Sequence, residues 1–65
     1  MNFRNYYERC WLATDGKTGA IYDIFPNSLG GPLTVTATID GVVTTLGEAD
    51  CYDEAVRMCE SHDAQ

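Results

Sequence analysis

Apolar and polar residues alternate most regularly between residues 33 and 47, in the stretch LTVTATIDGVVTTLG. Alternating β-branched residues predict two strands, and Asp40-Gly41 is typical of the two-residue turn that joins them. This turn sets the pairs that face each other across the hairpin: Ile39 with Val42, Ala37 with Thr44, and Val35 with Leu46. One face is then mainly apolar, because the other face carries Thr34, Thr36, Thr38, Val43 and Thr45. A one-residue slip would exchange the two faces, so the pattern also fixes the register.

Near the C-terminus the apolar residues recur at spacings of three and four, which predicts an amphipathic helix. The apolar stripe consists of Tyr52, Ala55, Val56 and Cys59, with His62 at the end of the pattern. The polar side consists of Asp53, Glu54, Arg57, Glu60 and Ser61. We expect Asp50 to cap the first turn and the helix to pack on the apolar face of the hairpin.

The N-terminal third has a less regular pattern. The stretch YYERCWLA alternates loosely, as a strand would that turns at TDGKTG into a second strand, AIYDIF. Helical spacing also fits, with Asn2 as cap, Gly16 after the end, and Phe3, Tyr6, Tyr7, Cys10 and Trp11 on one side. The tryptophan and tyrosine content favours a strand, but both alternatives stay open for residues 5–13. The prolines and glycines of PNSLGGPL predict a loop.

Together these elements predict one α+β domain spanning residues 1–65: a small antiparallel sheet of three or four strands with a C-terminal helix packed on one face. With 65 residues, of which 45% are hydrophobic, the chain can fold without help. A chain of this size buries only about 60% of its unfolded surface, so its core is thin. We therefore expect no deep active-site cleft.

Charge is distributed unevenly along the chain, whose formal net charge is −6. Residues 1–17 carry three cations and two acids, whereas residues 18–65 carry eight acids and a single cation, Arg57. Such a surface disfavours direct binding to nucleic acid or to an anionic membrane, and favours a basic partner protein. Solubility alone is the alternative explanation for the excess of acids.

The three cysteines, Cys10, Cys51 and Cys59, do not form a paired disulfide framework, which indicates a reducing compartment. No apolar run suggests a secretion signal or a membrane span. We therefore expect a cytoplasmic protein that acts as a monomer.

The sequence offers little for catalysis or for cofactor binding. Cys59 and His62 could face one zinc ion, but a closely paired second half of a four-ligand site is missing. Cys51 could be a nucleophile near a helix start, but Asp50 and Asp53 beside it would disfavour the thiolate. We expect no enzyme activity, no metal and no cofactor. Tyr6, Tyr7, Trp11 and Tyr22 fit a thin core better than a binding surface with Arg4 and Arg9.

The acids of the predicted helix are the remaining candidate site. Acids three or four residues apart lie about 5 to 6 Å from each other, close to the spacing of successive phosphates on a nucleic-acid strand. Like charges at this spacing destabilise a helix by a few tenths of a kcal/mol per pair. The hypothesis is that they imitate a phosphate backbone and bind a basic groove on another protein. The candidate contact residues are Glu48, Asp50, Asp53, Glu54, Glu60, Asp63, Asp23 and Asp40.

In length, in its strand-and-helix plan and in the acidic segment GEADCYDEAVRMCESHD, the chain resembles the small phage anti-CRISPR proteins that mimic DNA, in particular inhibitors of a type I-C system. The resemblance implies a partner in the host cytoplasm, the CRISPR surveillance complex, whose basic PAM-reading surface would be blocked. Arg57 departs from a pure phosphate imitation, and it could pair with Glu54 or Glu60 or contact the partner. The alternatives are a structural or accessory module that assembles through aromatic residues, and an acidic antitoxin or immunity protein for a basic toxin.

Overall fold

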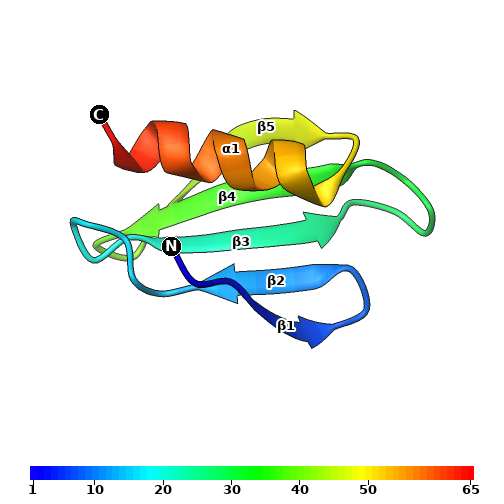
Figure 1. Ribbon diagram of the computed structural model, residues 1–65, viewed down its shortest axis with the longest axis horizontal. Helices are drawn as coiled ribbons and strands as arrows, with labels where there is room; N and C mark the ends of the chain where they lie inside the picture. Colours follow the sequence, from blue (N-terminus) through cyan, green and yellow to red (C-terminus); the bar gives the residue numbers. More distant parts are fainter.

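A computed structural model describes all 65 residues and contains five strands and one helix. The elements follow one another as β1 (Arg4–Tyr7), β2 (Cys10–Ala13), β3 (Ile21–Pro26), β4 (Leu33–Ile39), β5 (Val42–Ala49) and α1 (Tyr52–Asp63). The strands form one antiparallel sheet in chain order, and α1 lies across one face of it (Figure 1). The predicted α+β class is confirmed, and the sheet has five strands where three or four were expected. The single helix, α1, has 12 residues and lacks the length and the apolar character of a membrane span.

The extra strand arises in the N-terminal segment, where residues 5–13 form neither a helix nor one continuous strand. The chain reverses at Glu8-Arg9 into a hairpin of β1 and β2, with Arg9 in the left-handed region at φ 54°. The Asn5 side-chain amide donates hydrogen bonds to the carbonyls of Tyr7 (2.8 Å) and Cys10 (3.0 Å), which closes the turn. The predicted strand preference is therefore confirmed, but the turn inside it was missed because Glu-Arg is not a typical turn sequence.

The β4–β5 hairpin has the predicted turn and most of the predicted register. Asp40 and Gly41 both have positive φ (52° and 79°), as this type of two-residue turn requires. The register differs beyond Thr45, where Leu46 forms a bulge and Val35 lies opposite Gly47 instead of Leu46. Gly47 has φ 149°, and a Cβ there would lie only 3.0 Å from Cε of Met58 in α1. The bulge and the glycine together let the helix pass close over β5.

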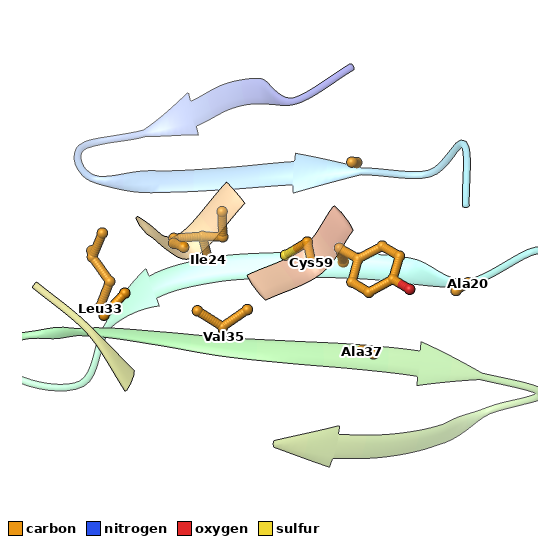
Figure 2. Packing of buried hydrophobic residues seen from close by; sticks show 10 residues of the cluster. Ala20, Ile24, Leu33, Val35, Ala37 and Cys59 are labelled. Atoms are coloured by element: carbon orange, nitrogen blue, oxygen red, sulfur yellow. The ribbon is translucent and has the colours of Figure 1, made fainter. Parts of the chain in front are cut away.

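The core lies between α1 and the face of the sheet that it covers. Ten apolar residues are buried there: Ala13, Ala20, Tyr22, Ile24, Leu33, Val35, Ala37, Ala49, Ala55 and Cys59. Half of them are alanines, so the helix approaches the sheet closely and the core remains thin. Figure 2 shows Cys59 of α1 over the strands that carry Ile24 and Val35.

An aromatic group closes this core beside the first turn of α1. The ring of Tyr52 lies 4.6 Å from that of Trp11 and 6.2 Å from that of Phe3, measured between centroids. Such edge and tilted contacts add to the stabilisation from burial. Trp11 and Tyr22 thus belong to the core, as predicted, but the same prediction is wrong for Tyr6 and Tyr7, which are exposed.

Candidate acidic surface

The solvent-facing side of α1, called here the outer side of α1, consists of Asp53, Glu54, Arg57, Glu60 and Ser61, all exposed. The opposite side buries Ala55 and Cys59 and half-buries Tyr52, Val56 and His62. The apolar stripe predicted from the sequence is confirmed. Because packing fixes the rotation of the helix, the three acids of the outer side are held in one orientation relative to the sheet.

The first turn of α1 begins differently from the prediction. Cys51 is the N-cap, in extended conformation and without a side-chain capping bond, so the prediction that Asp50 caps the helix is wrong. Asp50 stands one residue too early for its carboxylate to reach the first free N–H groups. Instead, the backbone N–H of Asp50 donates to Oε1 of Glu54 at 3.3 Å. This bond ties the exposed Asp50 to the outer side of α1, one turn before Glu54.

Asp63 was predicted on the same acidic surface, but its carboxylate turns toward the sheet. Oδ1 of Asp63 accepts hydrogen bonds from the backbone N–H of Lys17 (2.9 Å) and from the hydroxyl of Tyr22 (3.4 Å). The Tyr22 hydroxyl also bonds Nδ1 of His62 at 2.8 Å. Burial first, and Asp63 second, raise the pKa of Tyr22 above its ordinary value. This polar cluster fastens the end of α1 to β3 and to the β2–β3 loop.

Two further predicted acids lie on the other side of the sheet, the helix-free face. Asp23 stands on β3 beside Leu12 and Thr36, and its Oδ1 accepts a hydrogen bond from the hydroxyl of Tyr6 at 3.2 Å. Glu48, opposite Thr34 near the end of β5, accepts a bond from the side-chain amide of Asn27. Both carboxylates therefore serve contacts within the sheet.

Asp40, the last of the eight predicted residues, occupies the β4–β5 turn. The structure thus groups half of the predicted set around the outer side of α1: Asp50, Asp53, Glu54 and Glu60. The other half is distributed over three other places: Asp63 in the polar cluster, Asp23 and Glu48 on the helix-free face, and Asp40 at the turn. The acidic surface is smaller than the sequence predicted, and on α1 the exposed cation Arg57 stands among its acids.

No protein-family model matches the chain, and no curated protein or solved structure was found to be similar to it.

The groups considered for covalent or metal chemistry lie apart from one another. Cys10, Cys51 and Cys59 are all free thiols, and no group of three or more His, Cys, Asp or Glu side chains is placed to hold a metal ion. Burial raises the pKa of Cys59 to about 12, so this thiol stays protonated at neutral pH. His62, its candidate partner on the helix, is bonded to Tyr22. Cys51 is exposed, between Asp50 and the acids of the first turn.

Two features of α1 were not predicted from the sequence. The first is the inward contact of Asp63, although its spacing of four and eight residues from Cys59 and Ala55 places it at the border of the apolar stripe. The second is a hollow of about 420 Å³ between α1 and β5, with Leu46 and Met58 as its two apolar lining residues. Met58 extends the apolar side of the helix, but the position of β5 under it depends on the bulge, which the alternation of the hairpin does not predict.

Proposed function

We propose that the protein is a non-enzymatic inhibitor that uses the outer side of α1 to occupy a basic DNA-binding site on another protein. The phage anti-CRISPR proteins that it resembles suggest the partner, a type I CRISPR surveillance complex, and the site, the basic surface that recognises the PAM. The protein would thereby keep target DNA from engaging the complex.

One observation carries this proposal: the acids of the outer side are exposed, and the side-chain carboxylates of Asp53 and Glu60 have no hydrogen-bond partner in the chain. Asp53 and Glu54 gain some stability from the positive pole of the helix. Glu60, in the last half of α1, has no such benefit and lies near the negative pole. A carboxylate that contributes nothing to the fold is available to a partner.

The physical mechanism is charge replacement. A groove that binds DNA presents arginine and lysine side chains to phosphate oxygens, and arginine binds a carboxylate in the same bidentate way. Asp53 and Glu60 are seven residues apart, or about 10 Å along the helix axis. Since α1 is fixed on the sheet, these charges need no ordering when the partner binds. Binding would be fast, and it would weaken steeply with salt.

The test compares two variants with equal net charge. Asp53→Asn, Glu54→Gln and Glu60→Gln remove three charges from the outer side of α1, while Glu8→Gln, Asp15→Asn and Asp23→Asn remove three from elsewhere. We expect the first variant to bind a purified type I-C complex about 100-fold more weakly or worse, and the second to bind nearly normally. Equal losses in both variants would show that net charge, and not α1, controls binding.

A second candidate function, assembly through aromatic residues, is supported by Tyr6 and Tyr7, which are 56% and 71% exposed. Trp11 and Tyr22 do not support it, because both pack toward the core. Under this alternative, Tyr6→Ser with Tyr7→Ser would dissociate an oligomer seen by light scattering, and neutralising the acids of α1 would change nothing. A monomer that requires the α1 acids for binding would exclude it.

A further inference from the structure

β5 is the last strand of the sheet, and its outer edge pairs with no other strand (Figure 1). In a two-residue hairpin the first pair, here Ile39 and Val42, exchanges both backbone hydrogen bonds, and the pairs then alternate. The N–H and C=O groups of Val43 and Thr45 therefore point away from β4. No hydrogen bond outside the ladder involves either residue. Two donors and two acceptors are thus free along this edge.

The two edges of the sheet differ in how they are protected against a further strand. β1 has only four residues, is interrupted by a bulge between Asn5 and Tyr7, and carries Arg4. β5 has eight residues, and residues 42–46 contain no charge, no proline and no glycine. Val42 and Val43 are 65% and 64% exposed. A long, uncharged and exposed edge is a template for an additional strand.

The hollow between α1 and β5 lies on the helix side of this same edge. Leu46 and Met58 form its apolar part, and its polar lining comes from α1 and the C-terminus: Glu54, Arg57, Ser61, His62 and Gln65. Side chains alternate between the two faces of a strand, so every second side chain of an added strand would point to the helix side, toward the hollow. The edge offers backbone hydrogen bonds, and the hollow offers room for side chains. Strand-addition sites combine these two features: the free edge binds the backbone of the added strand, and pockets bind its alternate side chains.

We propose that the β5 edge and the hollow bind an extended segment of a basic partner by strand addition, with apolar side chains of that segment over Leu46 and Met58. The inference rests on the basic partner of the proposed function and adds a second point of contact. Charge selects this occupant: Asp40 and Glu48 stand at the two ends of the edge, and in the hollow itself the single cation, Arg57, is matched by Glu54. A second copy is disfavoured, because antiparallel pairing of two β5 strands would bring Asp40 of one toward Glu48 of the other.

The test uses a blocked peptide of about ten residues that alternates lysine and valine, with glutamate in place of lysine in the control peptide. Amide hydrogen exchange of the 65-residue protein is followed by NMR. The amides of Val43 and Thr45 should exchange rapidly in the free protein and slow at least about tenfold with the lysine peptide, as expected when a free N–H enters a ladder. The glutamate peptide should have no effect.

Two variants separate the edge from the hollow. Val43→Pro removes an outward N–H without removing a ladder bond, and Ser61→Phe fills the hollow, with Ala64→Phe outside it as the control. We expect Val43→Pro and Ser61→Phe each to weaken binding of the lysine peptide about tenfold, and Ala64→Phe to leave its binding unchanged. Should Val43→Pro disturb the fold, the Ser61→Phe comparison decides.

Three results would overturn the inference. One is peptide binding that perturbs Asp53, Glu54 and Glu60 and leaves Val43 and Thr45 unprotected; another is no binding at all. The third is protection of Val43 and Thr45 in the protein alone together with a dimer mass, which would assign the edge to a second copy. None of these results affects the proposed function, which depends on the α1 charge variants and the surveillance complex.

Discussion

The outer side of α1 and the helix-free face of the sheet both carry carboxylates, but these differ in what they contact. On the helix-free face, Asp23 is bonded to Tyr6 and Glu48 to Asn27. On α1, the carboxylates of Asp53 and Glu60 have no partner in the chain, and that of Glu54 accepts one long bond from the backbone. Negative charge on the sheet therefore supports the fold, whereas on the helix most of it remains free to act on another molecule.

The largest effect is expected when one acid is moved from the outer to the inner side of α1. Glu54→Ala with Ala55→Glu keeps composition, net charge and helix propensity almost the same, but places a carboxylate where Ala55 is 0% exposed. We expect a loss of more than about 4 kcal/mol and an unfolded circular dichroism spectrum. Glu54→Ala alone should stay folded, within about 1 kcal/mol of the parent. A folded double variant would contradict the assigned rotation of α1.

A smaller effect distinguishes two acids of the same helix. Asp63→Ala removes the acceptor of the Lys17 N–H and of the Tyr22 hydroxyl, so the free energy of unfolding should fall by about 1 to 3 kcal/mol. Asp53→Ala removes no hydrogen bond and should change it by less than about 1 kcal/mol. Urea unfolding followed by circular dichroism measures both. Binding to the surveillance complex should show the reverse order, with Asp53→Ala the weaker binder.

Folding stability at alkaline pH should depend on Cys59, on the inner side of α1. Burial raises the pKa of the Cys59 thiol from 9.0 to about 12 and also raises the pKa of Tyr22. The unfolded chain then loses these protons at lower pH than the folded protein, so stability is complete below about pH 9 and falls as pH rises toward 12. Unfolding free energies measured from pH 8 to 11 should decline, and Cys59→Ala should flatten the decline. A decline unchanged in that variant would rule out Cys59 as its source.

The smallest predicted effect concerns the helix-free face. The pKa of Tyr6 is raised by burial and then by the charge and hydrogen bond of Asp23. Asp23→Asn should therefore lower this pKa, as measured by ultraviolet or NMR titration, without altering partner binding. An unchanged titration would show that the Tyr6–Asp23 bond does not form in solution, and reduced partner binding would extend the functional surface to this face.

The sequence pattern was sufficient to predict elements that depend only on neighbouring residues, namely the last hairpin and the buried side of α1. Asp40-Gly41 and the alternation on both sides of it predicted the last hairpin, and the spacing of Ala55, Val56 and Cys59 predicted the buried side of α1. The bulge at Leu46 could not be predicted, because it depends on the close passage of α1 over Gly47. The hairpin at Glu8-Arg9 was missed because its turn is supported by the side chain of Asn5, and not by a glycine.

The candidate site was predictable only in part, because some of its acids are placed by contacts between segments far apart in the sequence. Charges on one side of a helix follow from its period, so Asp53, Glu54 and Glu60 were grouped correctly. The positions of Asp23, Glu48 and Asp63 depend on which segments meet in three dimensions. Their hydrogen bonds to Tyr6, Asn27 and Tyr22 join residues at least 17 positions apart. Net charge alone does not distinguish these bonded acids from the free ones.

Whether the outer side of α1 replaces DNA on its partner can be measured by competition. A labelled duplex containing a PAM is bound to the type I-C surveillance complex, and the protein is added while the anisotropy of the DNA is followed. We expect complete displacement, with the apparent dissociation constant of DNA rising linearly with the concentration of free protein, and no displacement by the Asp53→Asn, Glu54→Gln, Glu60→Gln variant. A ternary complex that holds protein and DNA together, with the anisotropy unchanged, would contradict it.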